Sequence, residues 1–159
     1  MVYNILIYGK PNAGKSTISY NLVQDKLRNC VVFDGDVFRE YITPELGFSR
    51  EDILKNNYKC MKTIQMMNAQ GFNTITAMIM PYEESREYFR INLENLVEVY
   101  LCPPDEAREK RPNHRATEII FEVPPAPSDV IIHLDTEEWT IEECKRIIYE
   151  EMKGRKLIE

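Results

Sequence analysis

Apolar runs and stretches of helical spacing alternate along the chain. The apolar runs cover residues 3–8, 30–34, 73–80, 96–101 and 129–134. Continuous apolar residues, rather than strictly alternating ones, indicate strands that are buried on both faces, as in a parallel sheet covered by helices. The alternation of strand and helix therefore predicts an α/β domain with a five-stranded parallel sheet and helices on both faces.

A long helix is predicted to begin just after Ser49. Ser49 is a suitable N-cap, and Asp52 at the third helical position makes a near-match to the capping box. Met61, Ile64 and Met67 recur at helical spacing, so we expect them to face the core. A second helix, over residues 140–156, is amphipathic and is expected to close the domain.

Three polar residues share one stripe of the long helix. Asp52, Asn56 and Lys59 stand at positions i, i+4 and i+7. A polar stripe is usually a solvated face of a helix, so their spacing alone predicts exposed side chains.

Size and composition fit one domain over residues 1–159. The net charge is −6, with 20 Lys+Arg against 26 Asp+Glu, which gives no support for binding to nucleic acid or to a membrane surface. The four cysteines form no C-x-x-C pair, and the N-terminus lacks a signal-peptide pattern. These features predict a cytoplasmic location.

The clearest chemical signal is the stretch GKPNAGKST at residues 9–17. The spacing G-x-x-x-x-G-K-S, between a predicted strand and a predicted helix, is that of a phosphate-binding P-loop. Lys15 is expected to reach the β- and γ-phosphates of ATP, and the Ser16 hydroxyl to bind the Mg²⁺ that bridges them. The other predicted contacts to ATP in this loop are Gly9, Asn12, Ala13, Gly14 and Thr17.

The motifs of a nucleotide switch are missing from the sequence. The letters PNAGKST resemble the first motif of ribosome-assembly and tRNA-modification GTPases. Such GTPases also need D-x-x-G to sense the γ-phosphate and N-K-x-D to read guanine, and neither motif occurs in the chain. Phosphate transfer, and hence a P-loop kinase, is the favoured interpretation.

Two carboxylates follow the second predicted strand. Asp34 and Asp36 are predicted at the carboxyl end of a parallel strand, where α/β proteins bind ligands. One of the two carboxylates can face Mg²⁺, and we assign this role to Asp34. The other carboxylate can face an acceptor hydroxyl. Arg39, one helical turn further on, can hold an anionic acceptor. The alternative is that the two aspartates only cap a short helix.

Five blocks of the sequence resemble the adenylylsulfate kinase (APS kinase) family. They are GKPNAGKST, FDGDVFR, LGFSREDILKN, AMIMPYEESREYFR and VEVYLCPPDEAREKR, in the family's order and at nearly its spacing, from about residue 5 to residue 136. The resemblance implies ATP-dependent phosphorylation of the 3′-hydroxyl of adenosine 5′-phosphosulfate. Because the family is commonly dimeric, it also implies a homodimer.

The resemblance places individual residues at the site. Asp36 matches the aspartate that meets the acceptor hydroxyl, so Asp36 and Lys15 are the predicted catalytic residues. Arg111 matches an arginine that lies by the adenine of ATP. The residues predicted to contact the acceptor are Asp34, Asp36, Arg39, Phe48, Asn56, Pro81 and Tyr82.

The chain also departs from the family pattern. Ile53 stands where the family has an arginine, so one cationic contact to the acceptor is missing. The predicted lid, at about residues 104–127, is shorter than the family's, although Arg111, His114 and Arg115 can supply cations there. These departures leave two alternatives open: a kinase for a related nucleotide such as cytidine diphosphoramidate, and a nucleotide-binding regulator without turnover.

Overall fold

A parallel sheet forms the centre of the molecule. The computed structural model describes residues 1–25, 27–111, 119–125 and 131–159. Five parallel strands lie in the order β2-β3-β1-β4-β5, which confirms the predicted five-stranded parallel sheet. Their bounds are β1 (Asn4–Tyr8), β2 (Cys30–Asp34), β3 (Asn73–Met78), β4 (Leu96–Leu101) and β5 (Ile131–Leu134).

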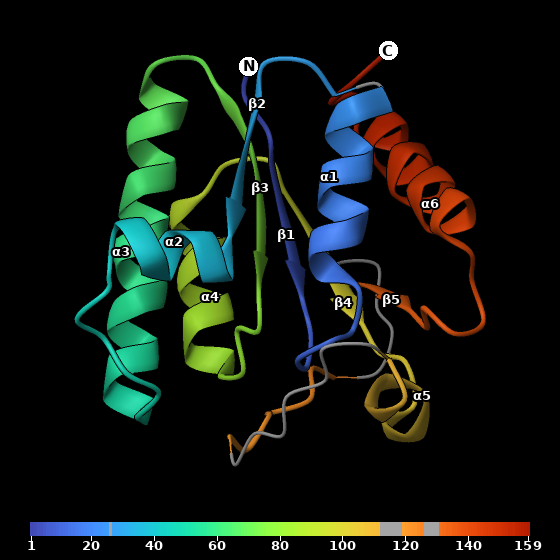
Figure 1. Ribbon diagram of the computed structural model, residues 1–159. Helices are drawn as coiled ribbons and strands as arrows, with labels where there is room; N and C mark the ends of the chain where they lie inside the picture. The colour runs from blue at the N-terminus through green and yellow to red at the C-terminus, as the bar shows by residue number, and fades with distance from the viewer. Residues whose placement is uncertain (26, 112–118, 126–130) are drawn as a thin grey trace.

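Helices cover both faces of the sheet, as predicted (Figure 1). The helices are α1 (Lys15–Asp25), α2 (Gly35–Tyr41), α3 (Arg50–Ala69), α4 (Glu83–Asn92), α5 (Asp105–Glu109) and α6 (Ile141–Gly154). One apolar core joins Ile5 and Ile7 of β1 to α1 and α6, and the other joins Leu6 to α3 and α4. β1 is thus buried on both faces, because successive side chains of a strand point to opposite faces.

The described helices include none that is long and apolar enough to span a bilayer.

The long helix α3 begins where the sequence predicted. The Ser49 side chain accepts a hydrogen bond from the Asp52 N–H at 3.1 Å, and Met61 and Ile64 are buried in the core. In a full capping box the third helical residue would accept a hydrogen bond from the N–H of the N-cap residue. Here the Asp52 carboxylate instead accepts a hydrogen bond from the N–H of Gly47 at 2.8 Å. Asp52 therefore fastens the preceding loop to the start of α3.

The prediction of a solvated stripe on α3 is wrong at Asn56. Asn56 is only 3% exposed, and its Oδ1 accepts a hydrogen bond from the Thr43 hydroxyl at 2.5 Å. Lys59, one turn further, is exposed and pairs with Glu45 at 3.2 Å. Because the loop between α2 and α3 folds back over α3, it buries one member of the stripe and leaves the next in solvent.

A fully buried arginine joins three segments near the end of β3. Arg86 of α4 donates to the Glu83 carboxylate at 2.9 Å, to the Met80 carbonyl at 3.0 Å and to the Glu122 carbonyl at 2.6 Å. Met80 has φ +45°, a left-handed conformation that ends β3 two residues earlier than predicted. The N–H of Glu122 donates to the Pro81 carbonyl at 2.8 Å, so the segment from residue 119 to residue 125 is tied to this bend.

We expect Arg86→Met to lower the free energy of unfolding by about 3–5 kcal/mol, because it leaves the buried Met80 carbonyl and the Glu122 carbonyl without this donor and removes one of the two arginines that pair with Glu83. Urea denaturation measures the loss. The matched control is Arg146→Met on α6, which removes an exposed pair with Glu150 and should cost at most about 1 kcal/mol. Equal losses in the two variants would contradict the role given to Arg86.

Candidate active site

The P-loop connects the end of β1 to α1. A Cβ atom at position 9 would lie 2.5 Å from the Leu101 carbonyl oxygen, so only glycine fits beside β4. Gly14 has φ +102°, a conformation that a side chain disfavours. Ala13 is buried, and its N–H donates to the Lys10 carbonyl at 3.3 Å. The loop thus has the tight backbone that the glycine spacing predicted.

Lys15 is the first residue of α1, where the P-loop ends. It is half-buried, and its ammonium group donates to the carbonyl of Lys10 at 2.9 Å. Burial lowers the pKa of Lys15 to about 8, against the opposing effect of the negative charges of Asp36 and Asp34. A lysine held in this way is ready to receive an anion, because an incoming negative charge restores the protonated form.

Ser16 and Asp34 meet at the carboxyl end of β2. The Ser16 hydroxyl donates to Oδ2 of Asp34 at 2.5 Å. Oδ1 of Asp34 accepts the N–H groups of Asp36 at 3.0 Å and Val37 at 3.3 Å, so Asp34 does cap α2 as the alternative interpretation expected. Capping uses only one of its two oxygens, and the other remains with Ser16.

A hydroxyl and a carboxylate in contact are the hard oxygen ligands that Mg²⁺ prefers. Within the described ranges, no group of three or more His, Cys, Asp or Glu residues could hold a metal. Mg²⁺ does not need such a cage, since it usually keeps several waters and binds one or two protein oxygens together with substrate phosphates. Ser16 and Asp34 therefore fit this ion.

The side chains of Asp36, Arg39 and Phe48 gather on the loop side of α2. Asp36 is exposed in the first turn of α2. Arg39 donates to the carbonyls of Leu46 at 3.2 Å and Gly47 at 2.9 Å, and its guanidinium stacks over the Phe48 ring at 4.2 Å. Phe48 remains 63% exposed. An aromatic surface and a cation are thus presented together near a carboxylate that has no hydrogen-bond or ion-pair partner among the described residues.

The other residues predicted at the acceptor are less open. Asn56 is buried behind Thr43, and both Pro81 and Tyr82 are buried at the end of β3. The Tyr82 ring faces the guanidinium of Arg50 at 4.9 Å. Ile53 is buried too, so the position where the resemblance expects an arginine is part of the packing of α3. All four positions are thus buried, in contrast to the exposed Asp36 and Phe48.

Arg111 lies against the opposite edge of the P-loop. It donates to the Asn12 carbonyl at 3.1 Å and to the Thr136 hydroxyl at 3.2 Å, and it pairs with Glu137 at 3.3 Å. The Asn12 side chain donates in turn to the Arg111 carbonyl at 3.3 Å. Because Thr136 follows β5, these contacts lie at the edge of the sheet away from Asp34. His114 and Arg115, the other predicted lid cations, lie outside the described residues.

Two further residues support the P-loop and were not singled out from the sequence. The Thr136 hydroxyl donates to the Ala13 carbonyl at 2.7 Å, and Arg108 donates to the Pro11 carbonyl at 3.1 Å. Thr136 comes just after a predicted strand, so its position at the carboxyl end of the sheet was a usable signal. Arg108 lies within the last of the five family-like blocks, without a motif of its own.

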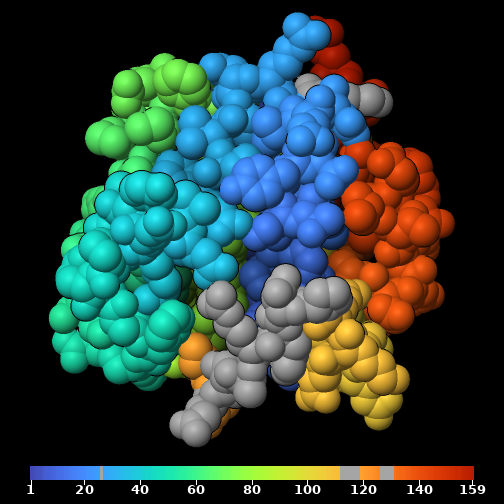
Figure 2. All heavy atoms as spheres, in the orientation of Figure 1, coloured from blue at the N-terminus to red at the C-terminus, as the bar shows by residue number. Residues whose placement is uncertain are grey.

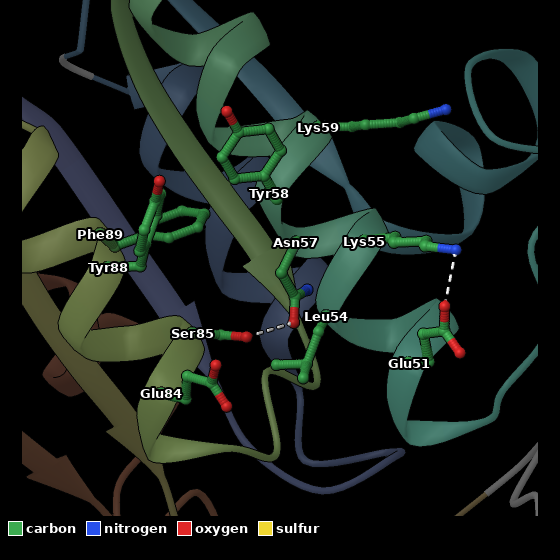
Figure 3. A pocket seen from close by; sticks show the side chains of 10 residues that line it. All are labelled: Glu51, Leu54, Lys55, Asn57, Tyr58, Lys59, Glu84, Ser85, Tyr88 and Phe89. Carbon is green, nitrogen blue, oxygen red and sulfur yellow. Dashed lines mark hydrogen bonds and ion pairs between the residues drawn. The ribbon is translucent and has the colours of Figure 1, made fainter.

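These elements surround the front of the P-loop. Figure 2 shows the cyan and teal atoms of α2 and α3 on one side of the blue P-loop and α1, and the yellow atoms of α5 on the other. A separate cavity of about 350 Å³ lies between α3 and α4 and is lined by Leu54, Tyr58, Tyr88 and Phe89 among others (Figure 3). None of the predicted site residues lines that cavity, so the P-loop front is the candidate active site.

A P-loop that follows the central strand β1, together with the Ser16–Asp34 pair and the exposed carboxylate of Asp36 after β2, defines a P-loop phosphotransferase of the nucleotide-kinase class. The family model for adenylylsulphate kinase matches residues 1–116. The chain belongs to the adenylylsulfate kinase family.

Relatives of this family match along much of the chain. A probable adenylyl-sulfate kinase of Archaeoglobus fulgidus is 36% identical over 115 residues, which cover 70% of this chain and 74% of the relative. The adenylyl-sulfate kinase of Staphylococcus carnosus is 33% identical over 166 aligned positions, which cover 94% of this chain and 83% of the relative. The family resemblance inferred from the sequence is therefore confirmed.

Solved structures share the fold. The Mycobacterium tuberculosis APS kinase, determined in complex with AMPPNP and APS, aligns with a TM-score of 0.80 at 22% identity and covers 96% of this chain and 98% of that one. A gluconokinase from Sinorhizobium meliloti aligns with a TM-score of 0.70 at 12% identity, covering 96% and 92%. Since kinases with different names share this fold, the fold alone does not select the acceptor.

Proposed function

We propose that the chain transfers the γ-phosphoryl group of ATP to the 3′-hydroxyl of adenosine 5′-phosphosulfate, giving 3′-phosphoadenosine 5′-phosphosulfate. The observation that carries this proposal is the meeting of Lys15, the Ser16–Asp34 pair and the exposed carboxylate of Asp36 at the carboxyl ends of β1 and β2. Membership of a family whose relatives are named adenylyl-sulfate kinases supports the choice of acceptor.

The donor side would use the P-loop. Backbone N–H groups of the loop from Gly9 to Thr17, including those of Asn12 and Gly14, would cradle the phosphates of ATP, and Ala13 would line the same loop. Lys15 would neutralise charge between the β- and γ-phosphates, and Arg111, fixed beside Asn12, would lie along the adenine. Ser16 and Asp34 would hold Mg²⁺, which when bound neutralises negative charge on the phosphates.

The acceptor side would use α2 and the loop after it. The exposed Asp36 carboxylate would orient the acceptor hydroxyl for in-line attack and accept its proton late in the reaction. Phe48 would receive the acceptor base on its open face, with Arg39 beside it. Asn56, Pro81 and Tyr82 would form the wall behind the acceptor. Because the transition state is loose, this positioning would supply most of the catalysis.

Transfer of labelled γ-phosphate from Mg·ATP tests the proposal. The acceptors are adenosine 5′-phosphosulfate, cytidine diphosphoramidate and plain nucleotides in parallel. Selective labelling of the phosphosulfate is the expected result. Selective labelling of cytidine diphosphoramidate would overturn the proposal. That result would be explained by Ile53, which puts an apolar side chain where the family has a cation that contacts the acceptor. ATP binding without transfer to any acceptor would instead indicate a regulator. The homodimer and the cytoplasmic location stay predictions.

ATP binding should take up a proton above pH 8. Burial lowers the pKa of Lys15 to about 8 without nucleotide, and the negative phosphates of ATP raise it. Below pH 8 Lys15 is already protonated before ATP binds, so the affinity for ATP should not depend on this group. The affinity should fall as the pH rises through about 8, because ATP binding must then be accompanied by protonation of Lys15.

Calorimetric titration near pH 8.5, in two buffers of different ionisation enthalpy, measures the proton uptake directly. Lys15→Met should abolish the uptake, whereas Lys110→Met, at an exposed position, should keep it. Wild-type binding without proton uptake would contradict the assignment of a lowered pKa to Lys15.

A further inference from the structure

Thr43 and Asn56 meet where the loop between α2 and α3 covers α3. Their exposed fractions are 0% and 3%, and the Thr43 hydroxyl donates to Oδ1 of Asn56 at 2.5 Å. Asp52 and Lys59, the other members of the polar stripe of α3, also bind this loop, but neither of them is buried. The bond between Thr43 and Asn56 is therefore shielded from water, unlike the other two contacts.

The position of Thr43 is fixed by the backbone. Its N–H donates to the Phe38 carbonyl at 3.3 Å at the end of α2, and its carbonyl accepts the N–H of Leu46 at 3.1 Å. The side chain is also stiff at χ1, because threonine is branched at Cβ. The hydroxyl therefore has little freedom to follow Asn56, and the Asn56 amide must turn to meet the hydroxyl.

This contact uses only one end of the Asn56 amide. An asparagine side chain has a carbonyl oxygen that accepts hydrogen bonds and an NH₂ group that donates two. Oδ1 is occupied by Thr43, whereas Nδ2 makes no hydrogen bond to a described residue. In the part of the chain that the structure describes, the buried side-chain atoms without a partner are Nε of Arg108 and Nε2 of His133, and Nδ2 of Asn56 is not one of them. The donor end of the amide therefore reaches solvent.

We propose that Thr43 is a positioning residue, which holds the Asn56 amide so that its N–H groups, and not its oxygen, face the acceptor nucleotide. The inference rests on the proposed function, which places Asn56 behind the acceptor. An amide held in this way donates to a lone pair of the nucleotide, on an oxygen or on a ring nitrogen. Without the hydroxyl of Thr43 the amide is free to turn over and to present its partly negative oxygen to an anionic ligand.

A double-mutant cycle between Thr43→Val and Asn56→Ala tests the proposal. The kinetic constants for adenosine 5′-phosphosulfate and for ATP are measured in the four proteins by transfer of labelled γ-phosphate. Thr43→Val should lower kcat/KM for the phosphosulfate roughly tenfold, mainly by raising KM, and should leave KM for ATP within about twofold of the wild-type value. In the Asn56→Ala background the same substitution should have no further effect, because the amide through which Thr43 acts is gone.

Two further threonine variants separate positioning from packing. Thr43→Ser keeps the hydroxyl and loses a methyl group, whereas Thr43→Val keeps the packing and loses the hydroxyl. Positioning predicts that serine is the better substitute for acceptor binding, and a role in packing alone predicts the reverse order. Thr63→Val is the matched control, since the Thr63 hydroxyl donates at 2.8 Å to the Lys59 carbonyl within α3 itself. That variant should leave both KM values unchanged.

Nitrogen-15 NMR of the wild-type protein tests the orientation of the amide directly, and it decides the question even if Thr43→Val does not fold. The side-chain N–H signals of Asn56 should shift, and should exchange more slowly with water, when adenosine 5′-phosphosulfate binds. Unchanged signals at a saturating concentration of the phosphosulfate would overturn the proposal.

Failure of the inference and failure of the proposed function give different results. If Thr43→Val lowers kcat/KM by the same factor in both backgrounds, or does not lower it at all, Thr43 does not act through Asn56 and the kinase stands. If the wild-type protein phosphorylates another nucleotide or none, the proposed function itself is refuted, and the role of Thr43 toward the phosphosulfate falls with it.

Discussion

The Asp36→Asn variant should bind ATP as the wild type does and transfer phosphate about 10²–10⁴ times more slowly. Asp36 is exposed in the first turn of α2, close enough to Lys15 to influence its pKa. Asparagine keeps the size of the side chain and removes the base that orients the acceptor hydroxyl and takes its proton. The N–H of Asp36 that Asp34 caps belongs to the backbone, so α2 should form in the variant as well.

Single-turnover transfer from labelled ATP, together with a separate titration of ATP binding, measures the two properties. Glu40→Gln is the matched control, because Glu40 is an exposed acid on the same helix. That variant should transfer phosphate at the wild-type rate. Turnover by Asp36→Asn within a fewfold of the wild type would show that the carboxylate does not have the proposed role.

Lys15→Met should reduce kcat/KM by about 10³-fold or more. The ammonium group is fixed inside the P-loop by the Lys10 carbonyl, so its charge does not have to be rearranged when the phosphates arrive. Preorganised charge of this kind is most effective on the transferring phosphoryl group, where negative charge is redistributed in the transition state.

The fold should tolerate this loss. Burial already disfavours the charged form of Lys15, so methionine should change the free energy of unfolding by no more than about 1 kcal/mol. Urea denaturation checks this point, and Lys55→Met, which removes an exposed pair with Glu51, serves as the control for activity. A folded Lys15→Met variant with wild-type kcat/KM would overturn the donor-side mechanism.

Most of the fold could be predicted from local patterns in the sequence. The apolar runs placed all five strands, because a strand buried on both faces needs a continuous apolar segment. Ser49 and Asp52 marked the start of α3, since capping depends on residues that are close in sequence. β3 was predicted too long, because the left-handed bend at Met80 follows from the contact that buried Arg86 makes with its carbonyl.

The candidate site was predictable where each of its parts belongs to a recognisable motif of its own. Ser16 and Asp34 were both expected at the metal, and they lie in contact. Asn56 was misjudged from its spacing, because the loop that covers it folds back from another part of the chain. Arg108 was missed for a similar reason: the Pro11 carbonyl that it contacts lies 97 positions away in sequence and is brought to it only by the fold.

The hydroxyl of Thr136 reaches the Ala13 carbonyl across 123 positions of sequence. Contacts between residues so far apart form slowly, because the intervening chain must first be ordered. During synthesis, a nascent chain has its whole phosphate loop long before residue 136 leaves the ribosome, but this brace is absent until the last strand joins the sheet. Full affinity for nucleotide should therefore arise late in folding, only after the last strand of the sheet has been made and has joined its neighbours.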